Sequence, residues 1–274
     1  MSKPFSVLMS LYKNENPDYL LEALQSIIEQ TLKPSEIIIV EDGPLTPRLK
    51  RIVSNFARTY KCTRIISLEE NVGLGKALKI GTKEAKYEII ARMDTDDIAR
   101  NDRFEIELAC LEKMDCQLVG SNILEFENDK HSPISSRVVP EHDEQIRTFS
   151  KRRNPFNHMT VMFQKSAVLN VGNYQEMTDF EDYYLWLRLL KRNYKTYNVQ
   201  DNLVYARTDA DFLKRRSGFQ YIKSEYHFQK RILTEKLVGK IDFVINIFSR
   251  CLIRLVPVSI LKRIYTKFVH RKLE

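Results

Sequence analysis

Two patterns of apolar and polar residues alternate along the N-terminal part of the chain. Short apolar runs of strand length lie at residues 5–11, 35–40, 63–68 and 87–93. Segments with apolar residues at helical spacing lie between them, at residues 17–30, 45–60 and 73–85. Successive strand and helix units of this kind predict a parallel sheet with right-handed crossovers, in which ligands bind at the carboxyl ends of the strands.

The alternation is lost after residue 97. Helical patterns follow at residues 103–114, 141–153, 183–192 and 212–237, and strand-like runs at 117–126 and 159–164. Two amphipathic segments close the chain. The sequence therefore predicts an α/β protein with a mostly parallel central sheet flanked by helices, a mixed second half and a C-terminal helical extension.

The composition is that of a globular protein, with 43 % apolar residues in a chain of 274. Nine Lys and Arg residues but only two acidic residues lie in residues 236–274, so this segment carries +7 of the net charge of +8. A basic tail on a nearly neutral body favours contact of one segment with an anionic surface. It argues against a nucleic-acid groove across the fold.

Four cysteines are present, at positions 62, 110, 116 and 251, and they form neither a Cys-x-x-Cys pair nor a cluster with the histidines. This argues against zinc ligation and a disulfide framework and favours a reducing compartment. The N-terminus lacks the apolar core of a signal peptide, and no apolar run is long enough to span a bilayer. We therefore expect a cytoplasmic protein.

The apolar run at residues 87–93 stops at three closely spaced carboxylates, Asp94, Asp96 and Asp97. Carboxylates crowded in this way repel one another, and oxygen ligands at a strand end suit Mg²⁺ or Mn²⁺, which share their coordination with substrate phosphates. A solvated acidic turn before the next helix is the alternative interpretation. Polar residues also follow the other three predicted strands, at residues 12–15, 42 and 71–76. A common pocket at one edge of the sheet is therefore favoured over four unrelated turns.

Six ordered motifs make the chain similar to the inverting family-2 glycosyltransferases of bacterial O-antigen and exopolysaccharide assembly. They are SVLMSLY at 6–12, VEDGP at 40–44, NVGLGKAL at 71–78, MDTDD at 93–97, NHMTVM at 157–162 and EDYYLW at 181–186. The resemblance covers roughly residues 4–210 and implies the A-type nucleotide-sugar transferase (GT-A) fold. It also implies metal-dependent transfer of one hexose or N-acetylhexosamine from a UDP-sugar to a lipid-linked, polyprenyl-diphosphate saccharide.

The resemblance, together with the charge and helical pattern of the tail, divides the chain into regions. Residues 1–210 would form the catalytic domain, with a nucleotide-binding half at 1–97 and an acceptor-binding half at 98–210. Residues 211–274 would form a helical, basic, amphipathic segment. Processive synthases of the family carry a Gln-x-x-Arg-Trp motif after the base, and its absence here favours addition of a single sugar.

The resemblance also assigns roles to the acidic residues. Asp96 is the expected first metal ligand and Asp94 a shared one, since a divalent ion can stabilise the departing diphosphate as a Lewis acid. Asp97 is expected to orient the loop or the sugar hydroxyls, and Thr95 to line the same pocket. Asp182 is the expected general base, because a carboxylate at a helix N-terminus tends to remain ionised. Displacement by the acceptor oxygen would then invert the anomeric centre.

Further residues of the resemblance would bind the nucleotide. Asp42 matches the aspartate that accepts a hydrogen bond from uracil, although an Asp-Gly turn is an equally simple interpretation. Relatives often have Asp-Asp-Gly-Ser at this point, whereas this chain has Glu-Asp-Gly-Pro, so the rim of the pocket is expected to differ. The other expected nucleotide-binding residues are Leu11, Tyr12, Glu15, Asn71 and Lys76.

Two expected sites have structural alternatives. His158 matches a histidine on the acceptor side, which would contact the diphosphate or the metal, or would only hold the local structure. Thr178 and Glu181 have the spacing of a capping box at the start of the helix that carries Asp182. Trp186 on that helix is expected to be core packing.

The C-terminal segment at residues 240–274 combines apolar and basic helical faces. A basic amphipathic helix commonly lies in an anionic lipid interface, so we expect peripheral binding to the inner leaflet of the cell membrane. The alternative is that its apolar face packs on the catalytic domain or on a second subunit, as in a homo-oligomer.

Two other functions remain open from the residues alone. One is a haloacid-dehalogenase phosphatase, but its acidic motif should follow the first core strand and continue with Thr where this chain has Ile98. The other is a catalytically degenerate nucleotide-binding scaffold of a membrane complex.

Overall fold

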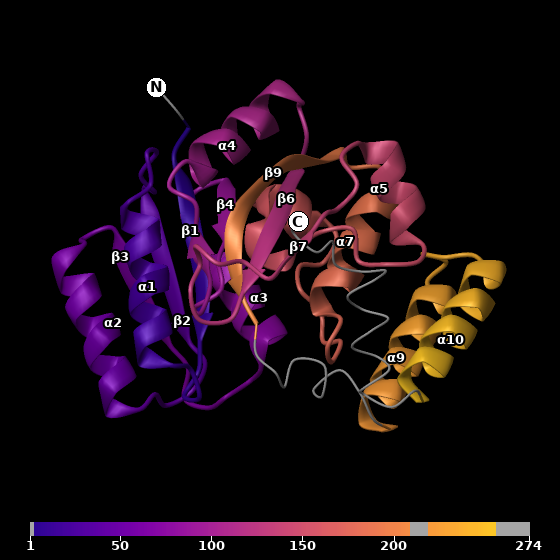
Figure 1. The fold of residues 1–274 in the computed structure, drawn as a ribbon, viewed down its shortest axis with the longest axis horizontal. Coiled ribbons are helices and arrows are strands. Elements are labelled where there is room, and N and C mark those ends of the chain that lie inside the picture. Colours follow the sequence, from indigo (N-terminus) through magenta and orange to yellow (C-terminus); the bar gives the residue numbers. More distant parts are fainter. Residues whose placement is uncertain (1–2, 209–218, 256–274) are drawn as a thin grey trace.

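The computed structural model describes residues 3–208 and 219–255, with side chains at residues 3–208 and 220–250. It contains one curved mixed sheet with helices on both faces (Figure 1). The strands are β1 (Phe5–Leu11), β2 (Glu36–Glu41), β3 (Thr63–Ser67), β4 (Ile89–Arg92), β5 (Ile98–Ala99), β6 (Leu118–Phe126), β7 (Ser135–Arg137), β8 (Met162–Gln164) and β9 (Thr196–Arg207). The helices are α1 (Pro17–Ile28), α2 (Pro47–Thr59), α3 (Leu74–Glu84), α4 (Arg103–Lys113), α5 (Asp143–Ser150), α6 (Lys165–Asn170), α7 (Glu181–Lys191), α9 (Phe219–Thr234) and α10 (Lys240–Leu255).

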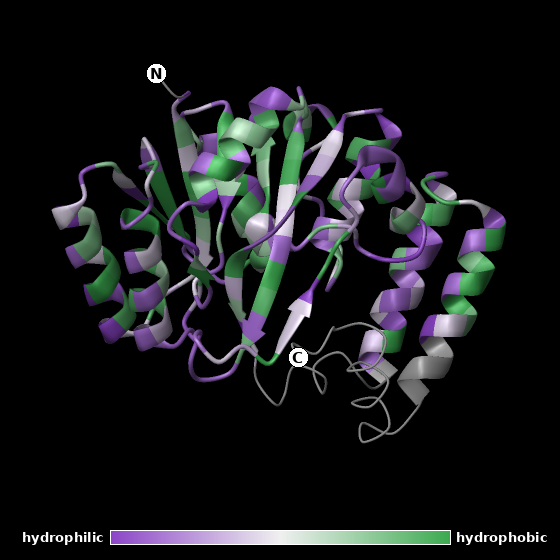
Figure 2. Cartoon of the chain, turned by 45° about the horizontal axis from the view of Figure 1, so that its top comes forward, coloured by the Kyte–Doolittle hydropathy of each residue, from purple (hydrophilic) through white to green (hydrophobic). Residues whose placement is uncertain are grey.

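The N-terminal half of the sheet is parallel, as the alternating pattern predicted. Its strands run in the order β3-β2-β1-β4, and the register pairs Val7 with Ile37 on one side and with Ala91 on the other. Residues of β1, β2 and β4 are almost entirely buried, and Figure 2 shows hydrophobic residues concentrated in the strands. These continuous apolar runs form strands because both faces of the sheet are covered.

Alternate residues of the strands pack into two cores on opposite faces. Val7 and Met9 of β1 belong to a core with α1, α2 and α4. Leu8, between them, belongs to a second core with α3, α6 and α7, where Trp186 is fully buried as expected. The carboxyl ends of the parallel strands therefore emerge at one edge between two helical layers.

The second half of the sheet is mixed, also as predicted. Strand β8 is antiparallel to both β4 and β6, and β6 is parallel to β9. The sequence pattern did not predict β9, which is half-exposed around Asp201 and Asn202 and shifts register against β6 near Asn122. This irregularity breaks the period of two by which a strand is recognised.

Two local predictions were wrong. The predicted strand at 159–164 is divided, because His158–Thr160 form a 3₁₀ helix, η1, before β8 begins. The predicted capping box is absent: α7 starts at Glu181 with Phe180 at the capping position and no side-chain cap. Asp179 has a φ of 67°, so the chain turns there and removes Thr178 from the capping position.

Helices α9 and α10 lie side by side at one edge of the molecule, beyond α5 and α7 (Figure 1). The start of the predicted helix at 212–237 lies outside the described residues, and α9 begins at Phe219. A third apolar cluster joins α9 and the segment before α10 to α7, and in it the rings of Phe180 and Phe228 stack with centroids 4.7 Å apart. Among the described residues, no helix is long and apolar enough to cross a membrane.

Candidate active site

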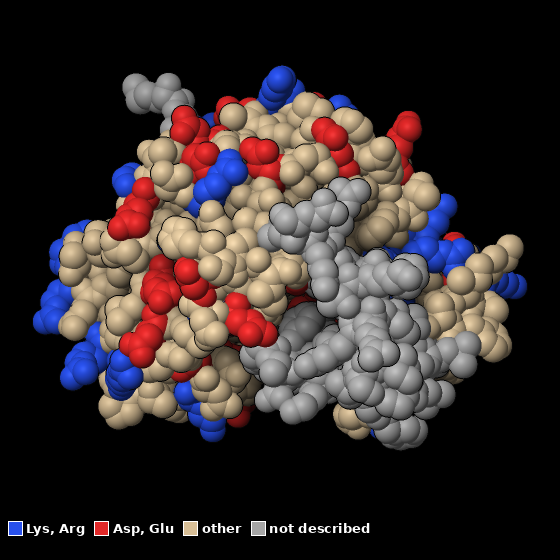
Figure 3. Space-filling model, in the orientation of Figure 1, with Lys and Arg blue, Asp and Glu red and all other residues tan. Residues whose placement is uncertain are grey.

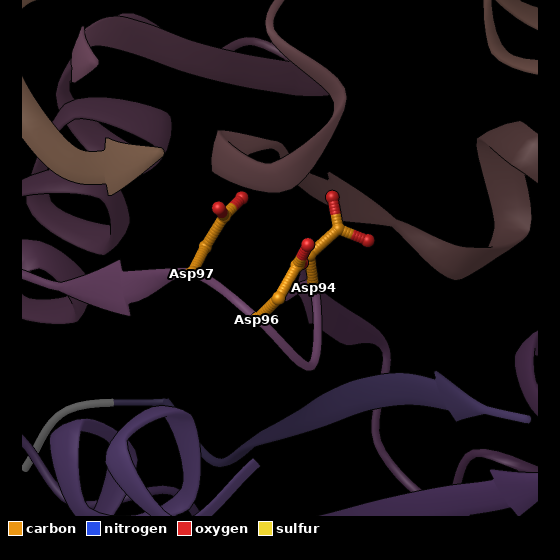
Figure 4. A group of neighbouring side chains, drawn as sticks. All are labelled: Asp94, Asp96 and Asp97. Atoms are coloured by element: carbon orange, nitrogen blue, oxygen red, sulfur yellow. The ribbon is translucent and has the colours of Figure 1, made fainter. Parts of the chain in front are cut away.

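The acidic motif forms a tight cluster in the loop between β4 and β5. One carboxylate oxygen from each of Asp94, Asp96 and Asp97 lies within 4.8 Å of the others. Their side chains extend to the same side of the loop (Figure 4). Because hard divalent cations take oxygen ligands from carboxylates, this donor set fits Mg²⁺ or Mn²⁺.

The electrostatics of the loop support this fit. Burial, followed by the negative charges of Asp94 and Glu15, raises the pKa of Asp96 to about 7. Burial and the charge of Asp96 raise the pKa of Asp97 well above its usual range. A divalent cation would relieve this repulsion and restore the ionised carboxylates.

Two contacts hold the acidic loop in place. The hydroxyl of Thr95 donates to the carboxylate of Glu15 in the β1–α1 loop, so two predicted nucleotide-pocket residues do meet. The backbone N–H of Arg207, at the end of β9, donates to Asp97 at 2.8 Å, and its Nε donates to the carbonyl of Asp96 at 3.2 Å. The hydrogen bond to Asp97 is consistent with the first of the two expected roles of Asp97, and both roles remain predictions. Arg207 was missed because β9 was not predicted.

A second missed residue is Arg92, the last residue of β4. Its guanidinium is completely buried and forms an ion pair with Asp94. Burial by itself lowers the pKa of Arg92, but the charge and hydrogen bond of Asp94 outweigh it and raise that pKa. The Nε and Nη1 atoms have no hydrogen-bond partner. An arginine inside an apolar strand run was the signal in the sequence, since buried charges need a partner.

Asp42 lies at the end of β2 and is buried. Its carboxylate accepts hydrogen bonds from the backbone N–H groups of Val72 at 2.7 Å and Gly73 at 3.1 Å. Gly43 has a φ of 84°, and a Cβ there would lie 2.6 Å from the backbone nitrogen of Asn71. Asp42 and Gly43 therefore hold the loop before α3, and the uracil contact of Asp42 remains a prediction.

The other predicted nucleotide residues lie around this loop. Leu11 is fully buried, and its carbonyl accepts from the backbone N–H of Asp42 at 2.7 Å, whereas the Tyr12 ring is 44 % exposed. The Asn71 side chain donates to the Asp42 carbonyl at 3.4 Å. Lys76 forms an exposed ion pair with Glu176 at 3.4 Å. Leu11 thus supports the pocket through its backbone, and Tyr12 and Lys76 are accessible to a ligand.

His158 stands on η1 and forms a hydrogen bond from Nε2 to the Tyr174 hydroxyl at 2.9 Å. Burial and the positive charge of Arg92 hold the pKa of His158 well below its usual range, so the imidazole is neutral. This is the structural role left open by the sequence. A neutral imidazole here also offers no charge to a diphosphate.

Asp182 lies in the first turn of α7. Its Oδ1 accepts from the backbone N–H of Tyr183 and its Oδ2 from the side-chain amide of Asn154, both at 2.6 Å. Burial and the charge of Asp182 raise the pKa of the adjacent Glu181 to about 7. Hydrogen bonds to the charged form favour an ionised carboxylate, as a base requires.

The acidic loop and the start of α7 share neighbours. The positive charge of Arg92 lowers the pKa of Asp96, Asp97 and Glu181. The negative charges of Asp182, Glu181 and Asp94 contribute to the raised pKa of the Tyr174 hydroxyl. A Cβ on Gly75, in the first turn of α3, would lie 3.2 Å from the Cβ of Glu181, so α3 and α7 approach closely. The start of α7, next to the predicted base, therefore lies against the first turn of α3, and Arg92 pairs with Asp94 of the acidic loop.

Other surfaces do not share this chemistry. On the face shown in Figure 3, basic side chains gather at the edge formed by α2, and acidic side chains lie over the centre. A surface hollow of about 840 Å³ lies between α1 and the β5 region and is lined by Glu22, Arg100 and Tyr205 among others. It contains none of the predicted site residues.

Solved structures with the same fold are nucleotide-sugar transferases. The chain superposes on S. aureus TarS 1-349 in complex with UDP-GlcNAc with a TM-score of 0.64 at 17 % identity, covering 84 % of this chain and 66 % of that one. It superposes on mannosyltransferase PcManGT from Pyrobaculum calidifontis, in complex with GDP-Man and Mn²⁺, with a TM-score of 0.66 at 16 % identity, covering 90 % and 69 %. The chain has the GT-A fold, as expected.

Sequence relatives cover nearly the whole chain. The amylovoran biosynthesis glycosyltransferase AmsE of Erwinia amylovora is 38 % identical over 96 % of this chain and 98 % of its own. An Escherichia coli UDP-Gal:alpha-D-GlcNAc-diphosphoundecaprenol beta-1,3-galactosyltransferase is 38 % identical over 97 % of both chains. The model of glycosyl transferase family 2 matches residues 6–178. The protein is therefore a glycosyltransferase that belongs to glycosyl transferase family 2.

Proposed function

We propose that this enzyme transfers one hexose or N-acetylhexosamine from a UDP-sugar to a polyprenyl-diphosphate-linked saccharide, in the assembly of a bacterial surface polysaccharide. The observation that supports the proposal is the carboxylate cluster of Asp94, Asp96 and Asp97, paired with Arg92, in a fold where the first turn of α3 packs against Glu181 at the start of α7. The E. coli relative, whose name gives UDP-Gal as donor and a diphosphoundecaprenol-linked sugar as acceptor, supports both substrate classes.

On the donor side, Asp96 and Asp94 would hold Mn²⁺ or Mg²⁺. When bound, the cation supplies Lewis-acid stabilisation of the departing diphosphate. The chain itself keeps the loop in position through Arg207 and Glu15 and offers Lys76 to a phosphate. Leu11, Tyr12, Asp42 and Asn71 would form the base and ribose pocket.

On the acceptor side, Asp182 would take the proton of the acceptor hydroxyl. Asn154 orients its carboxylate by a 2.6 Å hydrogen bond, and the backbone N–H of Tyr183 favours its ionised form. The acceptor oxygen would attack the anomeric carbon from the side opposite the diphosphate, and the configuration would invert. An α-configured donor would then give a β-linkage.

The proposal is tested with purified enzyme, a panel of UDP-sugars and a synthetic lipid-diphosphate saccharide, with mass spectrometry as the readout. UDP-Gal with a GlcNAc-diphospholipid is the first pair. We expect Asp182→Asn and Asp96→Ala to abolish transfer, whereas Asp179→Asn retains it, because Asn tolerates the positive φ at that exposed position. A product with retained anomeric configuration in its NMR spectrum would contradict the mechanism.

The same experiment separates the enzyme from a degenerate scaffold. A scaffold would bind UDP without any turnover that depends on Asp182. Family membership argues against the phosphatase, and the acidic motif follows the fourth strand of the chain, not the first.

The lipid moiety of such an acceptor keeps it in a membrane. We therefore infer that the enzyme works as a cytoplasmic peripheral protein at the inner face of the cell membrane. Residues 240–274 would make the contact, and part of this segment, up to residue 255, is described as α10.

A further inference from the structure

Helix α10 turns Asp242, Asn246 and Arg250 toward the protein, beside the half-buried Phe243 and Ile247, and exposes a row of apolar residues to solvent. The outward residues are Ile241, Val244, Ile245 and Phe248, which are 75 %, 49 %, 45 % and 65 % exposed. Their spacing of i, i+3, i+4 and i+7 places them on one face of the helix. We call these four residues the α10 stripe. A helix that packs on a soluble domain normally shows the reverse arrangement.

The orientation of α10 is held by polar contacts on its inner face. Arg250 donates from Nη1 to Glu225 of α9 at 2.9 and 3.1 Å, and Glu225 is fully buried. Asn246 donates to the carbonyl of Lys151 at 2.9 Å and to Gln229 of α9 at 3.1 Å. Turning the helix to bury the α10 stripe would break all of these contacts.

A further ion pair joins the start of α10 to the catalytic domain. Asp242 pairs with Arg152, just after α5, at 2.9 Å. The polar residues at positions 242, 246 and 250 therefore share one face, and all three meet the body of the protein. In the described part of α10, these polar residues and not the α10 stripe face the rest of the protein, and the amphipathic stretch from Val258 lies outside the described residues.

We propose that the α10 stripe is the face that enters the lipid interface. The inference rests on the proposed function, since a lipid-linked acceptor brings the enzyme to a membrane. Apolar side chains spaced along one helical face suit the boundary between headgroups and acyl chains. In Figure 3, which has the orientation of Figure 1, the edge formed by α10 is mostly uncharged.

Charge complementarity favours an anionic lipid surface as the occupant. The sequence that follows α10, residues 256–274, contains five Lys and Arg residues and one acidic residue. Lys240 is the first residue of α10 and precedes Ile241 of the α10 stripe, and Lys236 lies in the turn before the helix. Basic residues beside an apolar helical face add attraction to anionic headgroups.

Helix α9, which holds α10 through Glu225 and Gln229, also packs against the helix that carries Asp182. Phe228 of α9 stacks on Phe180, which immediately precedes α7, and the Tyr183 ring also packs on Phe228 at 5.0 Å. A membrane bound by α10 would therefore lie at a set position relative to α7. This suits an acceptor whose saccharide extends from the lipid surface by a diphosphate.

The test is sedimentation of the full chain with vesicles of phosphatidylglycerol and phosphatidylcholine. The stripe variant carries Val244→Ser and Phe248→Ser, and the control carries Leu21→Ser and Val138→Ser, which are exposed apolar residues at 48 % and 49 % but lie elsewhere. We expect the stripe variant to bind vesicles at least tenfold more weakly and the control to bind like the wild type. Equal binding of all three proteins would overturn the proposal.

Labelling distinguishes lipid from the other occupants. Phe248→Cys, in a background with Cys62→Ser and Cys251→Ser, should react with a maleimide in solution and become protected by the vesicles. Protection in solution that disappears when residues 256–274 are deleted would show that this segment covers the α10 stripe. Protection that depends on protein concentration, with a dimer in light scattering, would show a second copy there. Either outcome would refute lipid insertion.

Activity separates this inference from the proposed function. The stripe variant should transfer sugar to a short-chain, water-soluble acceptor at the wild-type rate and to the acceptor in vesicles more slowly. If the wild type transfers sugar to neither acceptor, the proposed function is wrong. The membrane inference would still stand in that case if vesicle binding depends on the α10 stripe.

Discussion

Arg92 is the buried cation of the active site, and replacing it with methionine tests its electrostatic role. Methionine keeps much of the side-chain volume but removes the charge that faces Asp94 and influences Asp96 and Asp97. Breaking a buried ion pair costs about 3–5 kcal/mol, and the low end applies here because the Asp94 side chain is 29 % exposed.

Two gains oppose this loss. The Nε and Nη1 groups of Arg92 are buried without hydrogen-bond partners. Removing each of these donors removes its desolvation penalty, for which we take about 1 kcal/mol of the free energy of unfolding. The expected net loss is therefore about 1 kcal/mol of the free energy of unfolding without metal. A change this small in the free energy of unfolding is a weak test, so the affinity for metal is the measurement that tests the role of Arg92.

Without Arg92, the carboxylates should bind Mn²⁺ more tightly. Two unit charges about 4 Å apart interact by about 4 kcal/mol at an effective dielectric constant near 20. Because the Asp94 side chain is 29 % exposed, solvent screens part of this interaction, and we expect a gain of about 1.4 kcal/mol, or about tenfold in affinity. The assay is Mn²⁺ titration by calorimetry or electron paramagnetic resonance.

Arg188→Met is the matched control. Arg188 is also buried, but it donates to the backbone carbonyls of Val171, Asn173 and Tyr184 instead of facing the acidic loop. It should lose stability without any change in Mn²⁺ affinity. An Arg92→Met protein that is folded and binds Mn²⁺ no more tightly than the wild type would refute the reasoning.

Three further outcomes are expected. Because the pKa of Glu181 is raised to about 7 in the folded protein, the free energy of unfolding should fall as pH rises from about 4.5 to about 7, by at most about 1.4 kcal/mol per pH unit; urea unfolding of Glu181→Gln should lack this contribution. Gly43→Ala should weaken UDP binding in calorimetry, since its Cβ would displace the backbone at Asn71; unchanged affinity would separate this loop from the nucleotide. Phe228→Ala should cost about 3–5 kcal/mol of stability and slow transfer, and normal transfer by the folded variant would uncouple α9 from α7.

The sequence by itself determined the elements whose signal is local. Continuous apolar runs predicted β1, β2 and β4, and the spacing of Leu20, Leu24 and Ile27 predicted α1, because both periods are read within one segment. The motifs placed Asp42 and Asp94 at strand ends, and a parallel sheet necessarily brings those ends to one edge. Family and fold followed from these features.

The tertiary structure alone decided which residues from distant segments meet. Arg207 reaches the acidic loop across 111 positions of sequence, and the Thr95 pair with Glu15 spans 80. A helical period shows that α10 has two faces, but its buried ion pair with α9 decided that the apolar face points outward. Such pairings depend on the packing of whole elements, and no local pattern of residues encodes that packing.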